Sequence, residues 1–272
     1  MIRLPSTAIA LGVAMTVLNA PSSAAPAKSA SKAGMSYPHA ATKDRVANEG
    51  VIEDVAVDAL RNMSNYLMQA KTLGISTEGS LDVVTDDGQR IQLDGTTTYK
   101  IRRPGFVIDY VSDMKSRRFI YDGKSFTVYS PKLGYYASVP APGTNKEVLD
   151  AIYNKFGISL PLVDLFRWGE GMNADRIKAL KSAYDVGPAT IDGAATEHYA
   201  FREADIDWEV WIQKGDQPLP RKMVIVDRSD PARPTFTSRL SWQVNPTYSD
   251  ADFSFVPDAD AKRIQLATYK GE

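Results

Sequence analysis

Cysteine is absent from this chain of 272 residues, and histidine occurs only twice. A disulfide-stapled scaffold and a thiolate metal site both require cysteine, so both are excluded. Basic and acidic residues nearly balance, with 32 Lys and Arg against 33 Asp and Glu. Proteins that bind nucleic acid usually carry a basic excess or stripe, so this balance argues against a nucleic-acid partner. A hydrophobic content of 43% is ordinary for a globular domain that builds its own core.

The first residues have the pattern of an export signal. A positive charge at Arg3 precedes an apolar run from Leu4 to Leu18, and small residues follow that run. This order predicts a secretory signal peptide over residues 1–24, with cleavage after Ala24. The alternative is an uncleaved membrane anchor, but the apolar run is shorter than the ~20 residues that a membrane span needs. We therefore expect an exported, soluble protein that does not span the membrane after cleavage.

Composition and periodicity divide the rest of the chain. Residues 25–48 are rich in Ala, Ser, Lys and Pro without periodicity, which predicts a flexible leader. A single domain is expected over residues 49–272, with a helical insert near residues 144–184. Apolar spacing of three and four residues predicts helices over 53–71, 145–156, 160–166 and 175–184.

Strand patterns lie on both sides of the helical insert. Short alternating runs are separated by Gly or Pro turns such as Asp86-Asp87-Gly88, which is typical of an antiparallel meander. The expected strands cover residues 81–83, 91–93, 96–103, 106–110, 118–121, 126–130, 135–139, 189–191, 195–202, 207–214, 221–227 and 235–245. Runs of strands around a few helices indicate an α+β fold.

Several turn motifs together resemble a known family. They are Arg-Pro-Gly-Phe at 103–106, Tyr-Asp-Gly-Lys at 121–124, and the stretches 191–212, 218–222 and 230–234. On these residues the chain resembles the bacterial predicted periplasmic proteins called domain of unknown function 2092. That family is similar to the carriers that ferry lipoproteins across the periplasm, the LolA/LolB-like superfamily. The resemblance implies a periplasmic protein with a strongly curved antiparallel sheet, an unclosed barrel of about ten strands, and helices that cover an apolar cavity.

Alternation along the strands independently suggests where such a cavity would lie. In each of several strands, large apolar side chains share one face, because successive side chains point to opposite faces. The candidate lining residues are Phe106, Ile108, Tyr110, Phe119, Tyr121, Phe126, Val128, Trp208, Val210 and Ile212. The alternative is that these side chains are solid core beneath the helices. If a cavity exists, its ligand is a lipid, a lipoprotein acyl chain or another hydrophobic molecule, since burying one methylene gains roughly 0.8 kcal/mol.

Catalytic groups are scarce, and we expect no catalytic residues, no metal and no cofactor. His198 stands in a strand without a nucleophile motif, so a structural role is favoured over a Ser-His-acid triad. Acidic residues at every second position are either a solvated strand end or calcium ligands. They are Glu203, Asp205, Asp207 and Glu209.

Two rival functions and one ambiguous feature remain open at this point. The first rival to the ligand-binding protein is an envelope interaction module with a solid core, in which a strand edge or the outer aromatic face, with Trp211, meets a protein partner. The second is a hydrolase that uses carboxylates alone, such as Asp205 and Asp207. The basic pairs at 102–103 and 117–118 either meet a lipid headgroup or an acidic partner, or serve as exposed charges on strand edges.

Overall fold

The computed structural model describes residues 50–160, 162 and 174–269. The predicted signal peptide, the predicted leader and nearly all of the predicted helix at 160–166 lie outside these residues. The described elements are, in chain order, α1 (Asp54–Gln69), β1 (Leu73–Val84), β2 (Arg90–Ile101), β3 (Phe106–Ser112), β4 (Ser116–Tyr121), β5 (Ser125–Ser130), β6 (Tyr135–Pro140), α2 (Asn145–Phe156), α4 (Ala174–Ala179), β7 (Ser182–Ile191), β8 (Ala194–Arg202), β9 (Ile206–Gln213), β10 (Pro220–Asp227), β11 (Thr235–Val244), η1 (Asp250–Phe253) and β12 (Lys262–Arg263).

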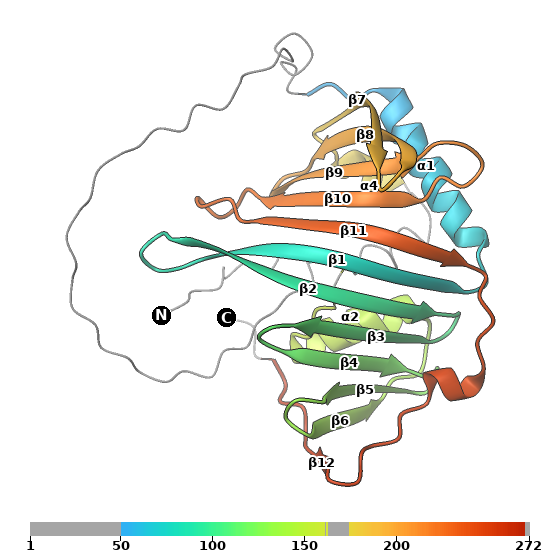
Figure 1. The fold of residues 1–272 in the computed structure, drawn as a ribbon, viewed down its shortest axis with the longest axis vertical. Helices are drawn as coiled ribbons and strands as arrows, with labels where there is room; N and C mark the ends of the chain where they lie inside the picture. Colours follow the sequence, from blue (N-terminus) through green and yellow to red (C-terminus); the bar gives the residue numbers. More distant parts are fainter. Residues whose placement is uncertain (1–49, 161, 163–173, 270–272) are drawn as a thin grey trace.

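All twelve strands join one sheet. Its order is β12-β6-β5-β4-β3-β2-β1-β11-β10-β9-β8-β7, and every pair is antiparallel except β12 with β6. The long connection from β6 through α2 to β7 carries the chain from one edge of the sheet to the other, so that β11 then pairs with β1 at the centre (Figure 1). Because β12 and β7 do not pair with each other, the sheet is curved but unclosed, which confirms the predicted α+β class.

Two helices cover one face of this sheet. In Figure 1, α1 lies along the half that holds β7 to β11, and α2 lies behind β3 and β4. We call the face toward the helices the inner face and the opposite one the outer face. Helix α1 buries Leu60, Met63 and Leu67 at the predicted helical spacing. None of the described helices is both long and apolar enough to cross a bilayer.

Local signals explain the ends of α2. The Thr144 side chain accepts from the Glu147 backbone N–H, and the Glu147 carboxylate accepts from the Thr144 N–H in return, which is a capping box. Gly157 ends the helix with a left-handed φ of 64°, and its N–H donates to the carbonyls of Ile152 and Tyr153. The prediction of a helix over 145–156 is therefore confirmed.

Two predicted elements are wrong. The fourth predicted helix, at 175–184, ends at Ala179, and β7 begins at Ser182 because Ala183 pairs with Phe201 of β8. The two runs expected at 91–93 and 96–103 form one strand, β2, which passes through Gly95 without a break and ends at Ile101. In both cases pairing with a neighbouring strand outweighs the local pattern.

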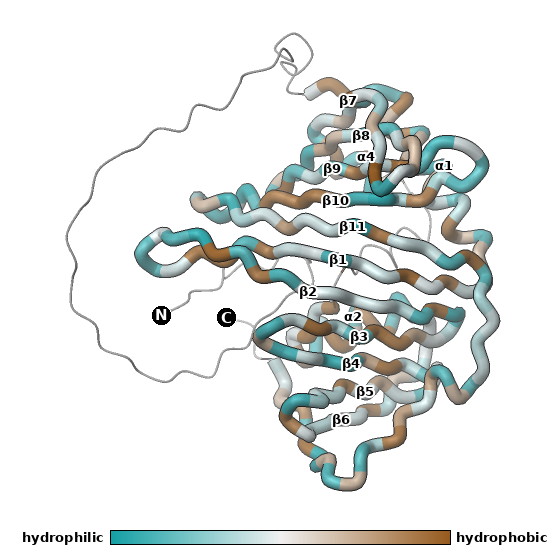
Figure 2. The backbone as a smooth tube through the Cα atoms, in the orientation of Figure 1, coloured by the Kyte–Doolittle hydropathy of each residue, from teal (hydrophilic) through white to brown (hydrophobic). Residues whose placement is uncertain are grey.

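The two faces carry different clusters. The main core joins buried residues of α1, α2 and the inner face. On the outer face Val107, Ile120 and Phe253 form a second, small cluster. Phe253 comes from residues 245–263, which we call the C-terminal strap; it ends in the pairing of β12 with β6. Figure 2 shows the corresponding alternation of hydrophobic and hydrophilic positions along the strands.

Candidate ligand-binding face

The structure places most of the ten predicted lining residues in the main core. Eight are buried members of that core: Phe106, Ile108, Phe119, Tyr121, Phe126, Trp208, Val210 and Ile212. Val128 is partly buried and packs against them. Strand register aligns their side chains on the inner face, since Phe106 lies opposite Tyr121 and Tyr121 lies opposite Phe126. The centroid of the Phe106 ring lies 5.5 Å from that of Tyr121 and 6.4 Å from that of Phe126.

Tyr110 is the exception among the ten. It lies on the inner face but outside the main core, over the glycine of the neighbouring strand. A Cβ built on Gly95 would approach the Tyr110 ring to 3.2 Å. In the same way a Cβ on Gly79 would approach the Phe236 ring to 3.3 Å. Gly79 and Gly95 pair with each other across β1 and β2, so neither position carries a side chain. The Tyr110 and Phe236 rings lie over these two glycines at the centre of the sheet.

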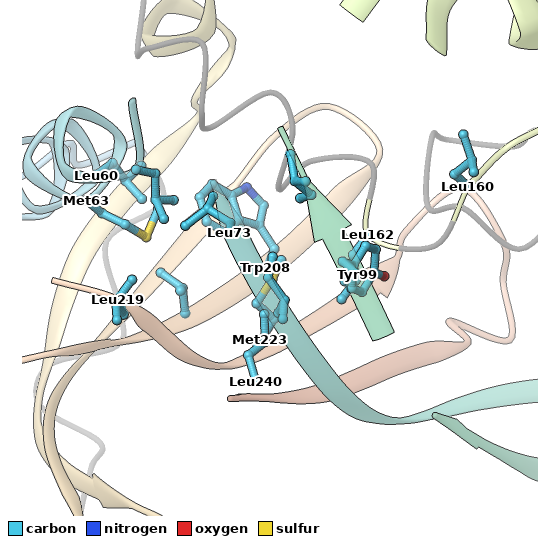
Figure 3. Close-up of a cluster of buried hydrophobic side chains, with 14 of the residues drawn as sticks. Leu60, Met63, Leu73, Tyr99, Leu160, Leu162, Trp208, Leu219, Met223 and Leu240 are labelled. Carbon is cyan, nitrogen blue, oxygen red and sulfur yellow. The ribbon is translucent and has the colours of Figure 1, made fainter. Parts of the chain in front are cut away.

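The centre of the inner face is shown in Figure 3. In this view Trp208 lies between Leu60 and Met63 of α1 and Tyr99 of β2, with Leu162 beside Tyr99. The Trp208 indole N–H donates to the Glu203 carboxylate at 3.1 Å, so the ring keeps its polar atom satisfied while its body joins the core.

Three hydroxyls stand among these apolar groups. Thr77 and Thr97 face each other across β1 and β2, and both are buried. Ser238 is fully buried opposite Gly79, and its hydroxyl has no hydrogen-bond partner within the described part of the chain. Buried hydroxyls are normally paired, so Ser238 offers a free donor and acceptor on the inner face.

Both covering helices are tied to one turn, residues 102–105 between β2 and β3. The Arg103 guanidinium donates to the carbonyls of Leu67, Met68 and Ala70, at the C-terminal end of α1. The Asn145 carboxamide, in the first turn of α2, accepts from the Gly105 N–H at 2.7 Å. Sequence reasoning treated Arg103 as an edge charge or headgroup ligand, and its capping role was missed. Carbonyls at a helix end need such partners, but nothing in the sequence pairs residues 67–70 with 103.

Tyr99, Tyr121 and Tyr199 of the inner face are uncharged at neutral pH, because each has a raised pKa. Burial raises the pKa of Tyr99 and of Tyr121 above the ordinary phenol value, and it raises the pKa of Tyr199 to about 12. The Tyr121 hydroxyl donates to the Gly143 carbonyl at 2.5 Å. Within the described ranges, no group of three or more His, Asp or Glu side chains is arranged to hold a metal ion. The inner face therefore offers apolar contact and a few neutral hydroxyls.

The other singled-out residues have structural partners. His198 stacks on Trp211 with ring centroids 3.9 Å apart, and its Nε2 lies 2.7 Å from Glu209. The Lys222 ammonium lies 4.2 Å from the centre of the same indole ring. Trp211 is consequently buried on the outer face, so the expectation that it is free to meet a partner is wrong.

Asp207, one of the acidic residues at alternate positions, forms ion pairs with arginines. Arg202 makes two bonds to the Asp207 carboxylate, and Arg233 donates to it at 2.9 Å. Both carboxylate oxygens are therefore used by guanidinium groups, which leaves Asp207 poorly suited to be a general acid in a hydrolase. Arg118 likewise pairs with Asp109 at 2.5 Å, on the outer face.

Two of the hollows among the described residues lie on the outer face. The larger, of about 820 Å³, lies over β1, β2, β3 and β11 and includes the carboxylates of Glu78, Asp94 and Asp113. The smaller, of about 330 Å³, lies beside the C-terminal strap, where Lys100 is paired with Asp252 at 2.6 Å. Both are on the opposite side of the sheet from the ten predicted residues.

Comparison with protein families gives one match that spans most of the chain. The model of a family described as predicted periplasmic protein, DUF2092, matches residues 56–267. No curated protein matches the chain.

Three bacterial proteins of known structure are among those to which this chain is similar. An uncharacterized conserved protein from Thermus thermophilus is 10% identical, with 78% of this chain and 99% of that one covered and a TM-score of 0.46. Lipoprotein LppX from Mycobacterium tuberculosis is 12% identical, with 72% and 98% covered and a TM-score of 0.43. A LolA superfamily protein, NE2245 from Nitrosomonas europaea, is 9% identical, with 74% and 97% covered and a TM-score of 0.35.

Proposed function

The chain belongs to the DUF2092 family of predicted periplasmic proteins, and from this premise we propose that it is a non-enzymatic periplasmic protein that holds a hydrophobic ligand, such as a lipid or a lipoprotein acyl chain, between the inner face and the helices. The ten predicted lining residues, Tyr110 at the margin, are proposed to contact that ligand.

The width of the apolar inner face carries this proposal. Twelve strands spaced by about 4.8 Å span roughly 50 Å along the curve of the sheet. Apolar side chains continue across this width, from Ala183 on β7 to Ala137 on β6. A face of this kind gains about 0.8 kcal/mol for each methylene it takes from water, on the order of 10 kcal/mol for a long acyl chain before ordering costs.

The unpaired hydroxyl of Ser238 adds a polar element to the same face. An ester or carboxyl oxygen of a bound lipid would satisfy it, in the way that a few polar groups orient a ligand in an otherwise apolar site. The neutral tyrosines favour an uncharged ligand body.

Two tryptophans on β9 provide an internal test. Trp208 lies on the inner face and Trp211 on the outer face, and each is 8% exposed, so the two form a matched pair. We would titrate the protein with dibromostearic acid, a fatty acid whose bromine atoms quench indole fluorescence on contact. In a protein that already carries Trp168→Phe and Trp242→Phe, the proposal predicts saturable quenching that persists in Trp211→Phe and falls sharply in Trp208→Phe. Equal losses in the two variants, or no saturable quenching in any form, would count against a ligand on the inner face.

A second candidate function rests on the larger outer hollow. The side chains of Glu78, Asp94 and Asp113 make no hydrogen bond or ion pair with the described residues, and they line a hollow of about 820 Å³. Lys132 and Arg239 also line the hollow, but Lys132 donates to the carbonyls of Ser112 and Asp113, and Arg239 pairs with Asp192. The three carboxylates therefore suit a cationic segment of an envelope protein. Chemical crosslinking in envelope extracts would compare the native protein with the variant that carries Glu78→Gln, Asp94→Asn and Asp113→Asn. A crosslinked partner that disappears with the variant supports this function, and identical crosslinks in both remove it.

A further inference from the structure

Two cations lie together at one end of the inner face, where a turn joins β3 to β4 (Figure 1). Arg117 of β4 lies opposite Tyr110 of β3, so its side chain shares the inner face with that ring. The Lys115 ammonium, from the turn itself, lies 5.8 Å from the centre of the same ring. All three residues are partly buried. We call Tyr110, Lys115 and Arg117 the cationic end of the inner face.

Neither cation is neutralised by the described part of the chain. The Arg117 guanidinium donates to the Ser130 hydroxyl at 2.6 Å and to a backbone carbonyl at 2.8 Å, and both acceptors are uncharged. The Lys115 ammonium forms no ion pair with any described residue. The adjacent Arg118 shows the contrast, because it points to the outer face and pairs with Asp109.

Arg117 keeps free the edge of its guanidinium that other arginines of this chain use for carboxylates. Within the described residues only its Nη1 atom donates, so Nε and Nη2 remain available. Arg118 and Arg202 hold the carboxylates of Asp109 and Asp207 through these same two atoms, at 2.5–3.2 Å. Arg117 therefore offers the pair of donors that binds two oxygens of a carboxylate or phosphate.

The place of β4 in the sheet excludes a simpler explanation for Arg117. From the sequence alone, this residue is either a headgroup ligand or an exposed charge on a strand edge. Charges discourage unwanted pairing only where a strand stands at the edge of a sheet. Strand β4 lies inside the sheet between β3 and β5, so Arg117 has no edge to protect.

The charge at this end is unfavourable without an anion. Taking a cation out of water costs free energy unless an opposite charge or strong acceptors compensate. Burial, followed by the nearby charge of Arg117, lowers the pKa of Lys115. An anion between the two cations offsets both effects, because an opposite charge within about 4–6 Å favours the charged form.

An apolar track starts at the cationic end and follows the strands. Phe119 and Tyr121 come after Arg117 at every second position of β4, and Val128 precedes Ser130 in the same way on β5. Phe119 and Tyr121 belong to the main core, and Val128 is partly buried against it. Four residues of a strand span roughly 13 Å, which is the length of apolar contact that lies between Arg117 and Tyr121.

We propose that Lys115 and Arg117 form an anion-binding subsite for the carboxylate or phosphate headgroup of an amphiphilic ligand, whose acyl chain lies along Phe119 and Val128. The guanidinium edge of Arg117 binds two headgroup oxygens, and Lys115 adds a second charge beside it. This inference rests on the proposed function and deepens it, because it identifies the ligand as an anionic amphiphile.

Calorimetric titration with three ligands that share one acyl chain tests the subsite on the native protein. Oleic acid presents a carboxylate, oleoyl lysophosphatidic acid presents a phosphate, and monoolein presents an uncharged glycerol. All are titrated below their aggregation concentrations, at a pH where the fatty acid is ionised. We expect both anions to bind about tenfold or more tightly than monoolein, because hydrogen bonds between charged groups are stronger than those to neutral ones.

Paired variants locate the effect on the protein. Lys115→Gln combined with Arg117→Gln should weaken the binding of both anions by about tenfold or more and leave that of monoolein unchanged. Retained monoolein binding also shows that this variant is folded. Arg118→Gln combined with Lys222→Gln is the matched control, since it removes the same charge from the outer face and should change none of the three affinities.

The outcomes separate this subsite from the proposed function. Equal affinities of the native protein for the three ligands, or the same loss in the inner and outer variants, would overturn the subsite and leave the proposed function intact. Inorganic phosphate that binds as tightly as the lysophosphatidic acid would assign the cations to a free anion and likewise overturn the headgroup role. A native protein that binds none of the three ligands would contradict the proposed function, and the subsite with it.

Discussion

Arg103 holds the C-terminal end of α1 against the turn between β2 and β3, and replacing it with alanine tests how much that anchor contributes. Its Nη1 atom donates to the carbonyls of Met68 at 2.8 Å and Ala70 at 2.9 Å, and Nη2 donates to Leu67 at 3.2 Å. Met68 is 42% exposed, so water can hydrogen-bond to its carbonyl once the Arg103 side chain is removed. The carbonyls of Leu67 and Ala70 are better shielded and lose more.

The magnitude follows from these contacts. Hydrogen bonds to a charged group contribute about 1.5–3 kcal/mol each, and a cation near a helix C-terminus contributes about 0.3–1 kcal/mol. Counting the two shielded bonds at the lower value, we expect Arg103→Ala to lower the free energy of unfolding by about 3 kcal/mol. For a domain of this size, that corresponds to a fall in Tm of roughly 6–12 °C.

Thermal melts followed by circular dichroism measure this change. Arg103→Lys keeps the charge but loses the planar fork, so its melting temperature should fall by an intermediate amount. Arg61→Ala is the matched control, because Arg61 lies on the same helix and makes only an exposed pair with Asp58. An Arg103→Ala protein that melts within about 2 °C of the native one, by the same scaling, would refute the anchoring role.

Three other changes test the packing around the face. Phe253→Ala empties the centre of the outer cluster and should lower the free energy of unfolding in urea by about 3–5 kcal/mol. Gly105→Ala places a side chain at φ 132°, which should cost at least about 1 kcal/mol in the same titration. Asp252 has its pKa lowered to about 2, first by the bond from Lys100 and then by the Ser249 backbone N–H. Because this pKa is lower than the ordinary value, the charged Asp252 carboxylate stabilises the fold above the ordinary pKa, and this contribution is lost as pH falls to about 2. Asp252→Asn should therefore flatten the decline in Tm over that acidic range.

Local patterns in the sequence predicted the elements whose ends are set by neighbouring residues. Helix α2 is an example, because Thr144, Glu147 and Gly157 supply both of its caps within the helix's own length. The alternation of side chains along a strand likewise predicted that Trp208, Val210 and Ile212 share one face, and all three lie in the main core.

Features that depend on distant partners could not be predicted in this way. Strand β7 was partly taken for a helix, because Ala183 is fixed by Phe201 and Ile52, which lie far from it in the sequence. Trp211 was expected on an exposed face, but His198 and Lys222 cover its ring. Whether an apolar face is core or cavity lining depends on how closely its covering elements approach, and side-chain alternation is the same in both cases.

Native mass spectrometry of the protein purified from the periplasm, with organic extraction of whatever accompanies it, tests the ligand-binding proposal most directly. We expect a stoichiometric lipid or other apolar adduct, which the extract would identify by class. A bare protein mass, together with no uptake of added fatty acid or phospholipid, would contradict the proposal and make the inner face an ordinary hydrophobic core.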